Sequence, residues 1–198
     1  MVIENSNRLE SRMLGIDPGL QCTGWGIVVQ DGLKLTHLAH GTIRTEATWS
    51  FANRLDKIHN RLTEVIIDWR PDIASVEQIF VAKSAQSAMK LGMARGVAMQ
   101  TCAAKGLTFR EVSAKQVKKA VTGSGAAEKN QVSAMVEKLL NIKPKALDAA
   151  DALAIAIAGI NIGSGYAATY SQDEMKTPKQ TSRLQQAIEV AIAKEQRR

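Results

Sequence analysis

The sequence has few of the residues that mark secreted, thiol-based or membrane proteins. Its two cysteines, Cys22 and Cys102, lie in apolar segments without the spacing of a metal site or a redox pair. We interpret them as small buried side chains in a reducing compartment. The longest apolar run, residues 152–160, has nine residues, whereas a membrane helix needs about 18. The first residues are polar and lack the apolar stretch of a secretory signal. These absences predict a soluble cytoplasmic protein that does not contact membranes.

Aromatic residues are also scarce, at 4% of the chain, whereas basic residues are in excess. The formal net charge is +7, and residues 105–145 carry nine Lys or Arg against three Glu. One interpretation of this basic stretch is a solvated surface, and the one that we favour is a binding surface for nucleic acid. The shortage of aromatic side chains argues against a platform on which bases stack, so contacts to phosphates should dominate.

The beginning of the chain has the pattern of three short strands joined by tight turns. Residues 13–18 open with a short apolar run and stop at a Pro-Gly turn, and residues 23–30 are β-branched and apolar. The pair Asp31-Gly32 is a strong signal for a hairpin that leads into a third strand over residues 33–45. The side chains of this strand that we expect to face inward are Leu33, Leu35 and Ile43.

Helices and further strands alternate in the segments that follow. Apolar residues at steps of three and four predict a helix over residues 51–69. The elements predicted after it are a strand at 73–80, a helix at 84–104, a strand at 107–112, a short helix with Ser113 as its N-cap, and helices at 128–141 and 146–160. Hairpins make neighbouring strands antiparallel, whereas helical crossovers make them parallel. The predicted fold class is therefore α/β: a ribonuclease H-like mixed five-stranded sheet, with three antiparallel strands and then two parallel ones, and helices on both faces.

The domain boundaries follow from the same pattern. We expect residues 13–162 to form one domain, preceded by an N-terminal extension at 1–12. Residues 163–198 read as a polar linker and a C-terminal tail, in which the last segment has the apolar spacing of a helix. In the helix at 84–104, Gly92 and Gly96 permit the close approach of another element. We favour packing against the protein's own sheet over a dimer contact, because most helices pack inward.

Four carboxylates lie in apolar surroundings, where a charge is costly. Asp17 ends the first strand, and Glu77 lies in the middle of the strand IASVEQIF. Asp148 and Asp151 lie in the apolar helix LDAADALAIAI. Considered singly, Asp17 could be a turn residue and Asp148 a helix-capping charge. Together, and without Lys or Arg in the same segments, the four acids should take up protons or bind a cation. Carboxylates without His or Cys favour Mg²⁺ or Mn²⁺ over zinc.

The positions of the acids allow them to meet in one site. Asp148 and Asp151 are three residues apart, so they share one face of their helix. The first and fourth strands of a mixed sheet can be neighbours, which would bring Asp17 close to Glu77. The histidines do not join this set, because His37 and His40 are three apart on a strand and should point to opposite faces. Metal ions held by carboxylates can activate water against a phosphodiester, and nearby lysines would neutralise the charge that develops. The predicted reaction is hydrolysis of a phosphodiester bond in nucleic acid.

Four segments carry a resemblance to a known family: LGIDPGLQCTGWGIV, VEQIFVAKSAQSAMKLGMARGVA, SAKQVKKAVTGSGAAEKNQV and LDAADALAIAI. Together and in this order, over residues 13–160, they resemble the RuvC family of Holliday-junction resolvases. The resemblance implies a Mg²⁺-dependent crossover junction endodeoxyribonuclease that nicks two opposed strands of a four-way DNA junction symmetrically, in recombination and repair. It also implies a homodimer that works beside the RuvA–RuvB branch-migration complex.

The resemblance further implies roles for individual residues. The acids that would hold two Mg²⁺ ions per subunit, with Mn²⁺ as a substitute, are Asp17, Glu77, Asp148 and Asp151. Lys118 and Lys129 match positions where the family has lysines important for cleavage or DNA contact. Phe80 matches an aromatic residue that stacks on a base near the crossover, although a core position is the alternative. The other residues from which we expect DNA contacts are Lys83, Lys115 and Lys119.

Three other functions are compatible with parts of the pattern. A sugar-kinase or actin-like ATPase also begins with a GIDxG-like strand end, but it needs two such lobes and about twice this length. A nucleic-acid-binding protein without catalysis would be expected to have lost one of the acids, and all four are present. A nuclease for RNA–DNA hybrids would use the same acids, so only the resemblance favours junctions over hybrids.

Overall fold

The structure, a computed structural model, describes residues 10–78 and 85–162. The strands in this part of the chain are β1 (Glu10–Asp17), β2 (Cys22–Asp31), β3 (Lys34–Arg44), β4 (Ile73–Glu77) and β5 (Thr108–Val112). The helices are α1 (Phe51–Trp69), α2 (Ala85–Ala104), α3 (Ala114–Thr122), α4 (Lys129–Leu140) and α5 (Leu147–Asn161). The predicted order of elements is confirmed. The linker and tail at 163–198, together with Phe80 and Lys83, lie outside the described residues.

The five strands form one mixed sheet in the order β3-β2-β1-β4-β5. β2 pairs antiparallel with β1 and with β3, whereas β4 pairs parallel with β1 and with β5. The predicted ribonuclease H-like sheet, antiparallel in its first half and parallel in its second, is therefore confirmed. β1 begins at Glu10, three residues before the predicted start, because β2 is long enough to pair with it as far as Asp31. β1 lies at the centre of the sheet, with β4 beside it.

β4 is shorter than predicted, and the difference matters for the site. The strand ends at Glu77, so Glu77 lies at the carboxyl end of β4 and not in its middle. Glu77 still pairs with Val112 of β5, and the Gln78 amide donates to the Val112 carbonyl oxygen at 2.8 Å. The ladder to β5 therefore stops directly after Glu77. Its side chain is placed at the edge where the parallel strands end.

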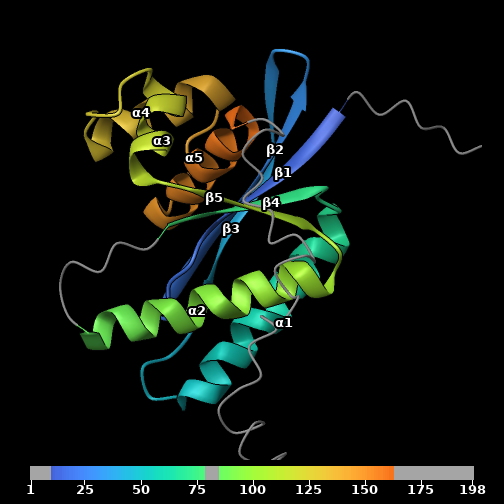
Figure 1. The fold of residues 1–198 in the computed structure, drawn as a ribbon, viewed down its shortest axis with the longest axis vertical. Helices are drawn as coiled ribbons and strands as arrows, with labels where there is room; N and C mark the ends of the chain where they lie inside the picture. Colours follow the sequence, from blue (N-terminus) through green and yellow to red (C-terminus); the bar gives the residue numbers. More distant parts are fainter. Residues whose placement is uncertain (1–9, 79–84, 163–198) are drawn as a thin grey trace, which may run out of the picture. The chain divides into compact units, whose positions relative to one another are not determined.

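Helices cover both faces of the sheet, as predicted (Figure 1). α5 lies against β1 and β2 with α3 and α4 beside it, and α1 and α2 pack together on the other face. α5 is apolar on nearly every side, and its residues from Ala152 to Ile160 are all buried. None of the helices in the described part of the chain is both long and apolar enough to cross a membrane.

The helix ends follow local rules that the sequence makes visible. The Ser50 side chain caps α1 by accepting from the Asn53 amide, and α1 stops at Arg70, directly before Pro71. Ser113 is the N-cap of α3, as predicted, and it forms a reciprocal capping box with Gln116. These caps fix where the helices begin relative to the strand ends that precede them.

Two expectations for β3 are wrong. Leu33 is fully exposed at the tip of the hairpin, and Leu35 and Ile43 pack into the clusters on opposite faces of the sheet. A β-bulge between β2 and β3 shifts the register at Leu38. The extra residue changes the alternation of side chains, so His37 and His40 share a face, with Nε2 of His37 at 2.8 Å from Nδ1 of His40. A period of two predicts the opposite, because it cannot anticipate a bulge.

The expectation for the glycines of α2 is also wrong. α2 packs inward through Ala94, Ala98, Thr101 and Cys102. A side chain added at Gly92 or Gly96 would meet no described atom within 4 Å. The glycines therefore do not mediate packing against the protein's own sheet. They lie on an open side of a helix that also exposes Met89 and Met93.

Candidate active site

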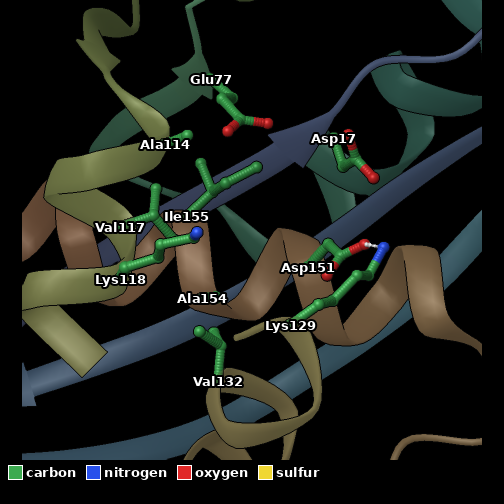
Figure 2. A pocket seen from close by; sticks show the side chains of 10 residues that line it. All are labelled: Asp17, Glu77, Ala114, Val117, Lys118, Lys129, Val132, Asp151, Ala154 and Ile155. Atoms are coloured by element: carbon green, nitrogen blue, oxygen red, sulfur yellow. Dashed lines mark ion pairs between the residues drawn. The ribbon is translucent and has the colours of Figure 1, made fainter. Parts of the chain in front are cut away.

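Three of the four predicted acids line one cavity of about 180 Å³. Asp17 comes from the end of β1, Glu77 from the end of β4, and Asp151 from the second turn of α5 (Figure 2). The remaining residues of the wall are Lys118 and Lys129 with Ala114, Val117, Val132, Ala154 and Ile155. The cavity thus has carboxylates facing lysines over an apolar floor.

The local fold explains why these acids meet. Ile16 of β1 pairs with Val76 of β4 in parallel register, and both side chains are buried on the α1 and α2 side of the sheet. The next residue on each strand, Asp17 or Glu77, points to the other face, since successive side chains alternate. That face is the one on which α5 lies, so α5 brings Asp151 over the strand ends.

Lys129 is the partner of Asp151 in this structure. Its Nζ lies 2.7 Å from Oδ2 of Asp151, and the two side chains are 67% and 25% exposed. Lys129 is the first residue of α4, whereas Asp151 belongs to α5. The cation that pairs with Asp151 therefore comes from another segment, and the sequence of α5 alone does not reveal it. Lys118 approaches the cavity from α3 and lies on the side of Glu77 (Figure 2).

The electrostatics of the cavity are unfavourable to its own carboxylates. Burial and then the charges of Asp151, Glu77 and Asp148, in that order of importance, together raise the pKa of Asp17 from 3.8 to about 7, while Lys129 opposes them. Burial and then Asp151 also raise the pKa of Glu77, against Lys129 and Lys118. The hydrogen bond to Asp151 raises the pKa of Lys129, so its ammonium group stays charged. The site therefore holds more negative charge than its lysines compensate.

Asp148 lies beside the cavity and does not line it. It belongs to the first turn of α5, and its carboxylate accepts a hydrogen bond from the Cys22 thiol at the start of β2. Burial and this carboxylate raise the pKa of Cys22 to about 11. Cys22 is only partly buried, so our interpretation of both cysteines as enclosed apolar side chains holds for Cys102 alone. Sequence reasoning missed the Cys22 contact because it joins segments 126 residues apart.

The basic residues of α3 do not all face the acids. Lys118 lines the acidic cavity, whereas Lys115 is exposed and its side chain lies along Gly125. Lys119 lines a separate surface depression with Asn161 at the far end of α5. The structure thus brings Lys118 and Lys129 together with the acids and leaves Lys115 and Lys119 outside the cavity.

The residues of the cavity fit a hard divalent cation by the chemistry of their donors. They offer carboxylate oxygens, which Mg²⁺ and Mn²⁺ prefer, and their charge is only partly balanced by lysines. In the described part of the chain, no three acidic, His or Cys side chains are close enough to hold one ion as they stand. Coordination would require rotation of these side chains, starting with release of Asp151 by Lys129.

The family described as Crossover junction endodeoxyribonuclease RuvC matches residues 13–159. The chain belongs to the RuvC family. It is 46% identical over 159 residues to the Crossover junction endodeoxyribonuclease RuvC of Caulobacter vibrioides, which covers 80% of this chain and 94% of that protein. The protein of the same name from Ruegeria pomeroyi is 47% identical over 166 residues, or 83% of this chain and 99% of the relative.

A solved member of the family has the same fold. RuvC of T. thermophilus, in complex with a Holliday junction substrate, matches with a TM-score of 0.71 and 34% sequence identity. The match covers 75% of this chain and 92% of that one. The RuvC resemblance predicted from the four sequence motifs is therefore confirmed, both by sequence relatives and by structure.

Proposed function

We propose that residues 13–162 are a Mg²⁺-dependent endonuclease that resolves four-way DNA junctions by nicking two opposed strands. The observation that carries this proposal is the convergence of Asp17, Glu77 and Asp151 in one cavity with two lysines, in a chain of the RuvC family. The junction as substrate is supported by the relative from T. thermophilus, whose solved complex contains one. The DNA-facing side would be the basic surface of α3 and α4.

The four acids would hold two Mg²⁺ ions, with Asp148 turning from Cys22 toward the cavity. When bound, the ions supply Lewis acidity, which activates water and neutralises charge on the scissile phosphate. The carboxylates of Asp17 and Glu77 are rigidly placed, because both end central strands of the sheet. The apolar floor at Val117 and Ile155 limits the water around the reacting phosphate.

The lysines complete the charge balance. As water attacks the phosphorus and the bond to the leaving oxygen breaks, negative charge grows on the phosphate oxygens. The ammonium group of Lys129 is largely exposed, so it can exchange its carboxylate partner for a phosphate oxygen. Lys118, on the Glu77 side of the cavity, is placed to do the same from α3. We assign the phosphate contacts nearest the chemistry to these two residues.

We further propose that the protein is a homodimer through the open side of α2. Met89 and Met93 are 54% and 40% exposed there, next to Gly92 and Gly96, where an added side chain would meet no atom of the described residues. A two-fold dimer suits a two-fold junction, because two sites then face two opposed strands. Met93→Glu should convert the dimer to monomers in analytical ultracentrifugation, while Leu139→Glu, at an exposed position of α4, should not. The family resemblance supports action in the cytoplasm beside RuvA–RuvB.

The function can be tested on a denaturing gel. A synthetic four-way junction and a linear duplex of the same sequence are incubated with the protein in Mg²⁺ or in chelator. We expect paired, symmetric nicks in the junction alone, lost with chelator and in Asp17→Asn. Tight junction binding without cleavage in both Mg²⁺ and Mn²⁺ would favour a binding protein instead. Equal cleavage of an RNA–DNA hybrid would favour the other nuclease, and indifference to junctions would refute the proposal.

A further inference from the structure

α5 lies on the sheet by direct backbone contact at the end that carries the acids. A Cβ atom added at Gly24 of β2 would overlap the carbonyl oxygen of Asp148. One added at Gly15 of β1 would overlap the carbonyl oxygen of Ala152, next to Asp151. The helix can therefore come this close only because no side chain stands between it and the two strands.

Gly24 has a second contact that connects it to the site. In the antiparallel register of β1 and β2, Gly24 is the residue directly opposite Asp17. One glycine thus touches the backbone of Asp148 on α5 and pairs with Asp17 on β1. The separation between the sheet-borne and the helix-borne carboxylates depends on how close α5 comes at this point.

We infer that Gly24 is a positioning residue for the acidic site. By letting the first turn of α5 rest on β2, it sets the distance of Asp148 and Asp151 from Asp17. A methyl group at this position would lift the acidic end of α5 and spread the carboxylates that must share a cation. The inference rests on the proposed function for the identity of the cation, but it concerns only the geometry of the acids.

Loss of close packing between α5 and the sheet could lower stability without moving the acids. Other glycines at the same interface separate this effect from a change in the position of the acids. A Cβ at Gly159, near the other end of α5, would meet Oγ of Ser75 at 2.6 Å. It would disturb the same helix–sheet interface far from the acids. A Cβ at Gly26 would meet the Leu153 side chain at 2.7 Å, which can move more easily than a backbone carbonyl.

The test compares Gly24→Ala with Gly159→Ala in the full-length chain. Mn²⁺ binding is measured without DNA, from the electron paramagnetic resonance signal of free Mn²⁺, and the melting temperature is recorded in chelator. We expect Gly24→Ala to weaken Mn²⁺ binding by about 10- to 100-fold, the range found when residues that orient metal ligands are changed. Gly159→Ala should lower the melting temperature and leave Mn²⁺ binding unchanged. The Mg²⁺ concentration for half-maximal junction cleavage should rise only in Gly24→Ala.

Unchanged Mn²⁺ binding in a folded Gly24→Ala would overturn the inference, and so would an equal loss of binding in Gly159→Ala. If Gly24→Ala does not fold, Gly26→Ala decides: it should weaken Mn²⁺ binding in the same direction but less, and no change would count against the inference. A parent protein that binds Mn²⁺ but does not cleave junctions would refute the proposed function and leave the positioning role of Gly24 testable.

Discussion

Asp17→Asn should stabilise the metal-free protein at alkaline pH while abolishing cleavage. Burial and the neighbouring carboxylates together raise the pKa of Asp17 from 3.8 to about 7, so the folded protein holds this proton more tightly than the unfolded chain. The stability cost is absent below about pH 4, grows as the pH rises toward 7, and stays constant above it. At 1.36 kcal/mol per pH unit, the cost above pH 7 is about 4 kcal/mol at most. Asp17 is partly accessible to solvent, so we expect about half of this.

Asparagine has almost the same shape and no charge, so it removes this cost. In chelator the variant should exceed the parent by about 2 kcal/mol at pH 8, or about 4–8 °C in melting temperature for a domain of this size. The difference should shrink to nearly zero at pH 4, where Asp17 is mostly protonated in the folded parent. Added Mg²⁺ should reverse the order at pH 8, because binding to the folded state stabilises only the protein that retains the site.

The assay is thermal unfolding by circular dichroism at pH 4 and pH 8, with chelator and with Mg²⁺. Asp68→Asn, an exposed residue of α1, is the matched control and should change nothing at either pH. If Asp17→Asn is no more stable than the parent at pH 8 in chelator, ionisation of Asp17 does not destabilise the folded protein. The charge argument for a cation site then fails.

Three further outcomes can be checked independently. Lys118→Ala should slow junction cleavage and lower the salt dependence of junction binding by about one phosphate contact, measured as the slope of log affinity against log salt; an unchanged slope would remove Lys118 from the phosphate. Lys129→Met should raise the pKa of Asp17 further in the metal-free protein, because the charge of Lys129 lowers that pKa. The measurement is the melting temperature against pH, whose fall should extend to higher pH in the variant. Leu33→Lys should change stability by less than about 0.5 kcal/mol in chemical denaturation, because the Leu33 side chain is fully exposed.

The elements that the sequence predicts well are those with strong local signals. The apolar steps of α1 and its Pro71 stop gave bounds that agree with the structure, and Ser113 was correct as an N-cap. The Asp31-Gly32 hairpin set the direction of β2 and β3, and helical crossovers set that of β4 and β5. The whole sheet order follows from such local rules once β1 and β4 are allowed to be neighbours.

What the sequence does not predict are contacts between distant segments. The bulge at Leu38 depends on how β2 and β3 fit together, and it decides where His37 points. The inner face of α2 is set by alanines and Cys102, which fit the α1 side of the sheet better than a stripe of glycines. Neither feature stands out in the sequence: the bulge depends on the fit of two strands, and the inner face of α2 has helical spacing but small side chains that differ little in hydropathy from the rest of the helix.

The cost of a buried charge accounts for both the success and the limits of the site prediction. A carboxylate in an apolar segment needs a partner in any fold, so burial alone identifies the acids. It does not say which partner each one finds: Asp151 meets Lys129 and Asp148 meets Cys22, both across long stretches of sequence. Asp17 forms no ion pair within the described residues, and its pKa is accordingly raised to about 7. The acid left uncompensated by the protein is the one at which a bound cation gains most, so Asp17 should be the acid whose loss weakens metal binding most strongly.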